Sequence, residues 1–289
     1  MPFPALHAYL QRLSDASRAP STVWLDARGQ AHGRFFDCTL TSAFQPIRAV
    51  ADGRLLGFEG LARGVSEADA GLSLWRLLDH AASDDESIEL DRLCRMLHAI
   101  NFFRQPAVEG ADLYLNVHDR LLSAVSSNHG HAFRRILQAL GLPVGQIVLQ
   151  LPAAGTARRW LVNYVADNYR RNGFRLALNA ATPAEAADAL EQFRPDVVKV
   201  DASAFDGGAG LERLLVLAQA RSAKVVFKRV ESPPSLEQIE RASANTGVTA
   251  YVQGDLIDVT RAELAAHGSA GDQALPAATA SAACPSAAP

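Results

Sequence analysis

The sequence has little of several features that would place it in a specialised class of protein. Only three cysteines occur in 289 residues, Cys38, Cys94 and Cys284, and their wide separation matches no metal-binding or disulfide pattern. No apolar run approaches the roughly 20 residues that span a bilayer, and the N-terminus lacks the basic-then-apolar order of a signal peptide. We therefore expect a reduced, cytoplasmic protein without disulfides.

An excess of charge of either sign is also missing. The 28 Lys and Arg residues nearly balance 31 Asp and Glu residues, which gives a formal net charge of −3. The sequence thus indicates neither a polybasic surface for nucleic acid nor an acidic tail, and we expect no nucleic-acid or membrane partner. With 48% hydrophobic and 20% charged residues, the composition is typical of a globular protein with a sizeable core.

The two ends of the chain differ from its middle. Residues 1–38 are predicted to form an N-terminal helix and a lead-in segment, with the helix ending near Pro20. Residues 268–289 contain nine Ala and a single charge, so they bury too little apolar surface to offset the entropy of ordering. We predict a disordered Ala-rich tail there and one folded domain over residues 39–267.

Between these ends, short apolar runs alternate with amphipathic helical stretches. Strands are predicted at residues 39–47, 55–61, 113–117, 147–151, 175–179, 197–201, 224–228 and 250–254. This alternation favours parallel strands covered by helices, and about eight strands suit a (β/α)8-type barrel. A doubly wound open sheet remains an alternative, although no Gly-x-Gly-x-x-Gly follows the first strand.

Polar residues end almost every predicted strand. They are Glu59, Asn116, Gln150, Asn179, Lys199, Asp201, Lys228 and Gln253. The carboxyl ends of barrel strands meet at one face, where active sites are built from several strands. One polar strand end is more often only a solvated terminus, whereas this many in step indicate a shared site.

The segment FQPIRAVADGRLLGFEGLAR resembles the opening of the EAL domain, the bacterial phosphodiesterase module for cyclic di-GMP. The family's Gln-Pro-Ile, Gly and Glu-Ala-Leu-x-Arg positions are here Gln45-Pro46-Ile47, Gly57 and Glu59-Gly60-Leu61-Ala62-Arg63. Further family positions follow in order, as Asn116, Lys199, Asp201, Val230, Glu231 and Gln253-Gly254. The resemblance covers residues 39–260 and implies an α/β fold, a modified (β/α)8 TIM-type barrel with one antiparallel strand near its start.

The resemblance also implies a cluster of carboxylates that holds two divalent cations, and most of these acids are replaced. The replaced positions are Gln150, Asn179, Ala180 and Lys228, so Glu59 is the one expected acidic ligand that remains, beside the neutral Asn116. Amides do not neutralise two dications, and an ammonium group repels them. We therefore expect a degenerate member with no metal, no other cofactor and no catalytic residue.

The retained family positions leave contact with the nucleotide open. They are Gln45, Glu59, Leu61, Arg63, Asn116, Lys199, Asp201, Glu231 and Gln253. Arg63 matches a family residue that contacts phosphate, and Lys199 and Lys228 would share the metal-free pocket. In the alternative that we favour, Lys228 pairs with Glu59 or Glu231 and merely neutralises the pocket.

Three functions from different classes follow from this pattern. The favoured one is a catalytically inactive regulator that acts through contacts with a protein partner of unknown identity. The alternative is a metal-independent cyclic di-GMP receptor, and the third is a weak phosphodiesterase, against which the lost carboxylates argue. A homodimer is also open, because the altered segment at Asn179 corresponds to one that shapes the family's dimer contact.

Overall fold

The structure, a computed structural model, describes residues 3–15, 22–36, 38–64, 83–108, 110–118, 129–153, 159–204 and 208–264. Its helices are α1 (Pro4–Asp15), α3 (Asp84–Phe103), α5 (His129–Ala139), α6 (Arg159–Arg171), α7 (Pro183–Phe193), α8 (Gly208–Ala220) and α9 (Pro233–Thr246). Its strands are β1 (Val23–Leu25), β2 (Ala31–Phe35), β3 (Cys38–Ala49), β4 (Leu55–Gly64), β5 (Asp112–Asn116), β6 (Ile147–Leu151), β7 (Arg175–Ala180), β8 (Val197–Asp201), β9 (Lys224–Lys228) and β10 (Ala250–Val252). The predicted helix end near Pro20 and the predicted tail lie outside the described residues.

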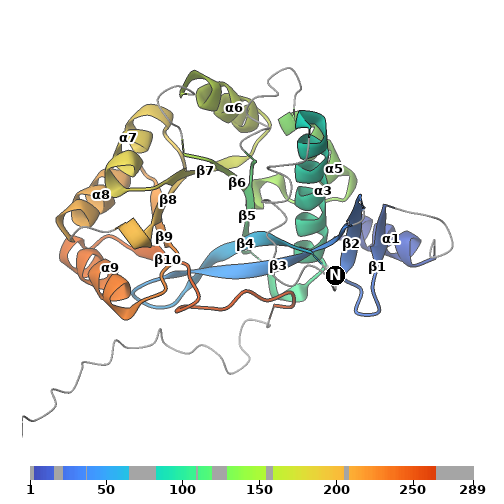
Figure 1. Cartoon of the computed structure of the whole chain (residues 1–289), viewed down its shortest axis with the longest axis horizontal. Helices are drawn as coiled ribbons and strands as arrows, with labels where there is room; N and C mark the ends of the chain where they lie inside the picture. Colours follow the sequence, from blue (N-terminus) through green and yellow to red (C-terminus); the bar gives the residue numbers. More distant parts are fainter. Residues whose placement is uncertain are drawn as a thin grey trace, which may run out of the picture.

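Strands β3 to β10 close into a barrel. The order runs from β3 through β10, β9 and the remaining strands back to β4, which pairs with β3. Strands β4 to β10 are parallel to their neighbours, whereas β3 is antiparallel to both β4 and β10. Figure 1 shows the helices outside this ring. The predicted modified barrel with one antiparallel early strand is confirmed, and the open sheet is excluded.

Local sequence explains where the elements begin. Ser83 caps α3, because its side chain accepts from Glu86 N while Glu86 reaches back to Ser83 N. Thr182 caps α7 and Pro183 occupies its first turn, a combination of residues that favours a helix start. Strand β6 is buried along its whole length, which is why its residues form a continuous run rather than an alternating one.

The barrel interior has two layers because strand side chains alternate in direction. An apolar layer contains Ile47, Tyr114, Val148, Ala177, Val197, Val226 and Tyr251. Two residues further along five of these strands stand Gln150, Asn179, Lys199, Lys228 and Gln253. With a period of two, these polar side chains point into the same interior, nearer the carboxyl ends. The apolar layer thus fills the middle of the barrel, and the layer of these polar side chains, which we call the polar mouth, lies at the carboxyl ends of the strands.

The hairpin of β1 and β2 extends the sheet beyond β3 and was not predicted from the sequence. Strand β2 pairs antiparallel with β3, and β1 pairs with β2. Both strands are short, and the sequence AHGRF of β2 carries no apolar run that would mark it. The hairpin lies within the predicted lead-in segment, beside α1 at one side of the barrel (Figure 1). The domain division after residue 38 remains a prediction.

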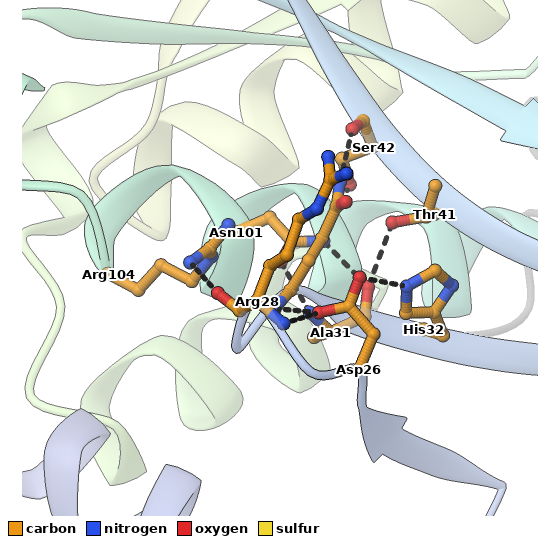
Figure 2. Close-up of polar contacts among 9 residues, drawn as sticks. Asp26, Arg28, Ala31, His32, Thr41, Ser42, Asn101 and Arg104 are labelled. Carbon is orange, nitrogen blue, oxygen red and sulfur yellow. Dashed lines mark hydrogen bonds and ion pairs between the residues drawn. The ribbon is translucent and has the colours of Figure 1, made fainter. Parts of the chain in front are cut away.

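A buried amide from α3 holds this hairpin in place. Asn101 accepts from Ala31 N at 2.7 Å and donates to Ala31 O at 2.8 Å, so its side chain acts as a strand neighbour (Figure 2). Thr41 also donates to Ala31 O, and Asp26 closes the turn by accepting from Arg28 N. Asn101 is fully buried, so these bonds are shielded from water.

None of the described helices has the length and apolar character of a membrane span.

We expect Asn101→Ala to lower the free energy of unfolding by about 2 kcal/mol, because the buried Ala31 N–H loses its acceptor and Ala31 O loses one of its two donors. Chemical denaturation measures this loss. The matched control is Asn245→Ala, which removes an exposed helical amide bonded to Glu212 and should change stability by less than about 0.5 kcal/mol. Equal losses in the two variants would show that the Asn101 contacts do not support the fold.

Candidate functional site

Glu59 stands at the centre of the polar mouth of the barrel, and hydrogen-bond donors surround it. Its Oε1 accepts from Asn116 Nδ2 at 2.7 Å. Its Oε2 accepts from Lys199 Nζ at 2.5 Å and from Gln253 Nε2 at 2.8 Å. Side chains from β5, β8 and the end of β10 therefore donate to this carboxylate of β4, and both of its oxygens accept hydrogen bonds.

The electrostatics of Glu59 are set by Lys199. Burial acts to raise the pKa of Glu59, but the charge of Lys199 and the hydrogen bonds from Lys199, Gln253 and Asn116 lower it to about 2. Lys199 is fully buried, donates to Gln253 Oε1 at 2.8 Å, and lies 5.6 Å from the centre of the Tyr114 ring. The pair is an internally satisfied ion pair rather than a free carboxylate beside a free ammonium.

Amides continue the polar layer around the barrel. Gln150 donates to Asn116 Oδ1 at 3.3 Å, and Asn179 donates to Leu151 O at 3.1 Å. Asn179 Oδ1 in turn accepts from Lys228 Nζ at 2.9 Å. At Gln150 and Asn179, where the family resemblance implies metal-binding acids, these amides thus donate or accept hydrogen bonds within the protein.

Lys228 does not form the ion pair expected from the sequence. Glu59 is already paired with Lys199, and Glu231 is exposed. No carboxylate of the described residues lies within 4.0 Å of Lys228 Nζ. Burial and the nearby charge of Lys199 lower the pKa of Lys228. The expected pairing with Glu59 or Glu231 is therefore wrong, because a deeper lysine already neutralises Glu59. Lys228 faces the site with only a neutral amide as its partner.

Arg229 occupies a position where the resembling segment has glycine, and its backbone shows why. Its φ angle is 58°, in the left-handed region that costs a residue with a side chain roughly 1–2 kcal/mol. The guanidinium contacts Asp201 Oδ2 and donates to Ser203 Oγ, while Asp201 Oδ1 also accepts from Ser203 N and Oγ. These contacts offset the strain and hold the Asp201 carboxylate.

The second residue of the signature, Gly60, is explained by a buried histidine behind the strand. A Cβ on Gly60 would lie 3.0–3.2 Å from atoms of His98. His98 Nδ1 lies 2.8 Å from Ser42 Oγ, and burial lowers the pKa of His98 to about 4, so the ring is neutral at physiological pH. A glycine inside a strand is a sequence signal for such a close approach, but it does not identify the neighbour.

An open cavity of about 250 Å³ lies at this end of the barrel. Six predicted positions line it: Gln45, Glu59, Leu61, Lys228, Glu231 and Gln253. Arg229, Gly254, Asp255 and Thr260 complete the lining. Sequence reasoning missed Asp255, although it directly follows the last strand motif, and its Oδ1 accepts from Gln45 Nε2 at 3.0 Å.

Seven predicted site positions are not part of the lining. Five of them bond to a lining residue, directly or through Asn116: Asn116, Gln150, Asn179, Lys199 and Asp201.

The other two lie apart from this network. Arg63 is exposed near the end of β4. Ala180 is buried in the cluster between the strands and the outer helices, together with Ala186 and Leu190 of α7. The structure therefore brings the polar strand ends together and separates Arg63 and Ala180 from them.

The donor set does not fit two divalent cations. Both oxygens of Glu59 already accept hydrogen bonds, and Lys228 adds a positive charge nearby. One buried oxygen, Gln150 Oε1, has no hydrogen-bond partner, but a single neutral amide oxygen does not balance a dication. Among the described residues, no group of three or more His, Cys, Asp or Glu side chains is arranged to hold a metal ion.

Comparison with known proteins identifies the family of the domain and relatives of its fold. The sequence model of the EAL domain matches residues 32–258. Among solved structures, the fold is similar to the Bacillus subtilis YkuI protein with an EAL domain, in complex with cyclic di-GMP and calcium (19% identity, TM-score 0.64). That match covers 78% of this chain and 56% of the YkuI chain, so this chain spans little more than half of that protein's length.

Shorter proteins match over almost their whole length. A standalone EAL protein from Vibrio cholerae O395, bound to cyclic di-GMP, is 18% identical with a TM-score of 0.60, covering 80% of this chain and 96% of its own. The FimX EAL domain is 17% identical with a TM-score of 0.61, covering 89% and 96%. At these identities the likeness concerns the fold. A search of the curated proteins finds no match.

We expect Gly60→Ala to destabilise the protein by about 1–3 kcal/mol, because the new methyl group lies only 3.0–3.2 Å from atoms of the buried His98, which must shift to make room. The cost should shrink in a His98→Ala background, which thermal or chemical unfolding of the two single variants and the double variant measures. Gly64→Ala is the matched control on the same strand, since a Cβ there meets nothing within 4 Å. Strictly additive losses would contradict the proposed contact.

Because the pKa of Glu59 is lowered in the folded protein, we expect the folded state to lose stability at acid pH. The contribution of ionised Glu59 to the free energy of unfolding is complete above the ordinary pKa of 4.5 and is lost as pH falls through about 2. We expect the wild type to lose about 3 kcal/mol more than Glu59→Gln over this window, by denaturant titration at each pH. Glu89→Gln, an exposed change on α3, should retain the wild-type slope. A wild-type slope in Glu59→Gln would mean that other carboxylates cause the loss.

Proposed function

The chain belongs to the EAL domain family, and from this premise we propose that it is a catalytically inactive member. In this proposal it regulates bacterial signalling by cyclic di-GMP through contacts with a protein partner. The cytoplasm is its proposed location, a reducing compartment that suits the unpaired Cys38 and Cys94.

One observation carries the proposal: the carboxylate of Glu59 is taken by Lys199, and a second lysine lines the same cavity. Metal-assisted hydrolysis of a phosphodiester needs cations that activate a water and stabilise the leaving oxygen. Lys199 and Arg229 hold the carboxylates of Glu59 and Asp201, while Lys228 bonds to a neutral amide. The other two carboxylates of the lining, Glu231 and Asp255, are exposed. The strand ends inside the barrel thus offer no free carboxylate to a cation, and no hydrolytic step is derived through one.

A second candidate function, a metal-independent cyclic di-GMP receptor, is favoured by a specific feature of the cavity. Lys228 lines the cavity and has an amide, not a carboxylate, as its hydrogen-bond partner. An ammonium without a carboxylate partner attracts a phosphodiester anion. The YkuI and Vibrio cholerae structures contain cyclic di-GMP, which makes this nucleotide the first ligand to test. Against it, Gln45 and Gln253 are already bonded to Asp255 and Glu59.

We expect no hydrolysis of cyclic di-GMP above a buffer blank with magnesium or manganese, because Glu59, the one expected acidic ligand that remains, is already held by Lys199. An active EAL phosphodiesterase assayed alongside shows that the substrate and assay are sound. Product formation by the wild type that disappears in Glu59→Ala would overturn the proposed inactivity.

Calorimetry with cyclic di-GMP, with and without magnesium, separates the two candidate functions. If the receptor is correct, metal-free binding occurs and Lys228→Glu weakens it at least tenfold, by about 1.4 kcal/mol or more. Lys224→Glu is the matched control, because Lys224 is exposed at the opposite end of β9. Absence of binding under both conditions would favour the regulator that acts through protein contacts alone.

A further inference from the structure

Lysine is rare in this chain, and two of its three copies lie at the polar mouth. Of the 28 Lys and Arg residues, only Lys199, Lys224 and Lys228 are lysines. Lys224 is exposed at the opposite end of β9 from Lys228. An arginine stays protonated in proteins, whereas a lysine that is withdrawn from water can become a neutral, nucleophilic amine. Lysine therefore supplies a chemistry at this site that the arginines elsewhere in the chain do not.

The charges around Lys228 favour the loss of its proton. Lys228 is half-buried, and its charged neighbours are Lys199, Glu59, Asp201 and Arg229. Both of these carboxylates already have a cation, because Glu59 pairs with Lys199 and Asp201 pairs with Arg229. Burial and the charge of Lys199 therefore prevail and lower the pKa of Lys228. A second ammonium close to a desolvated lysine is a known way of activating its amine.

An amide, rather than a carboxylate, contacts the Lys228 nitrogen. Nζ donates to Asn179 Oδ1 at 2.9 Å, and Asn179 Nδ2 donates to Leu151 O, which fixes the end of the amide that faces the lysine. The exposed carboxylates of the lining, Glu231 and Asp255, form no ion pair with Lys228. An amide oxygen accepts from a neutral amine as well as from an ammonium, so this contact does not oppose deprotonation.

We propose that Lys228 is a nucleophilic amine that binds small aldehydes and ketones covalently, as imines. The nitrogen attacks the carbonyl carbon, and both hydrogens of the amine pass to the carbonyl oxygen, which leaves as water when the C=N bond is complete. The step needs no oxidant or reductant. The open cavity that Lys228 lines, about 250 Å³ in volume, admits the carbonyl compound and releases the water.

The other two lysines lack this combination of features. Lys199 is fully buried and is held by a carboxylate and an amide, so a carbonyl compound does not reach it. Lys224 lies outside the cavity and is exposed, so water solvates its ammonium. The inference is independent of the proposed function, because cyclic di-GMP carries neither an aldehyde nor a ketone.

Reductive trapping on the full chain tests the proposal, with pyridoxal as a small aldehyde without a phosphate group. Cyanoborohydride reduces each imine to a stable amine, and peptide mass spectrometry assigns the label to Lys228, Lys224 or the amino group of Met1. At about pH 7.5, labelling should be at least about fivefold faster at Lys228 than at Lys224. This comparison uses the wild type, so it does not depend on the folding of a variant. Equal or slower labelling at Lys228 overturns the proposal.

A carboxylate beside the nitrogen provides the second test. Asn179→Asp places a negative charge next to Lys228 and holds it as an ammonium, so its labelling should fall at least about fivefold at about pH 7.5 and recover at higher pH. A chelator keeps this measurement free of metal ions. Labelling of Lys224 should not change, and the matched control Asn245→Asp, an exposed change on α9, should leave both rates unaltered. If the pH dependence of Lys228 labelling does not move in Asn179→Asp, the proposal is wrong.

Discussion

The ion pair between Lys199 and Glu59 is the constraint on which the interior of this barrel depends. Removing two opposite charges from water costs several kcal/mol each, and only good geometry with further hydrogen bonds recovers that cost. Gln253 contacts both partners and Asn116 contacts the carboxylate, so the pair is satisfied from β4, β5, β8 and the end of β10. Because each of these strands must place one side chain at the same point, the ion pair constrains the register between the strands of the barrel.

The surrounding residues are consistent with this central pair. Around this pair stand amides, which add no charge: Gln150 donates to Asn116, and Asn179 donates to the backbone oxygen of Leu151. Lys228 uses an amide oxygen, and Arg229 holds Asp201 from the outer edge of the site. Glu59, Asp201 and Asp255 thus each have a hydrogen-bond donor, and Glu231 is exposed at the rim of the cavity.

Sequence patterns were sufficient to predict the parts of the fold that depend on residues adjacent in the chain. The buried run of β6 and the Thr182-Pro183 start of α7 are properties of a few adjacent residues, so they are visible in the sequence alone. The hairpin of β1 and β2 was not visible, because Asn101, 70 residues away, supplies the hydrogen bonds that a longer strand would receive from a neighbour. Its formation is a tertiary effect.

The same distinction applies to the site. The alternation of side chains along the strands was enough to predict that the polar strand ends converge, because all parallel strands end at one face. The partner of Lys228 was beyond prediction, since it depends on which of two lysines lies deeper. The role of Arg229 was hidden as well, because only the backbone angle and the nearby Asp201 explain an arginine at a left-handed position.

The contact between Gly60 and His98 also bears on how this sequence can change over time. Alanine at residue 60 alone would lie within 3.0–3.2 Å of the histidine, and replacing the histidine first would remove the group bonded to Ser42. An acid at residue 228 would place a second carboxylate in the cavity that Glu59 lines, and glycine at residue 229 would release Asp201. Each of these single changes is opposed by a neighbour of the present residue. Substitutions at these positions are therefore coupled, so that a change at one of them is tolerated only together with a change at its neighbour.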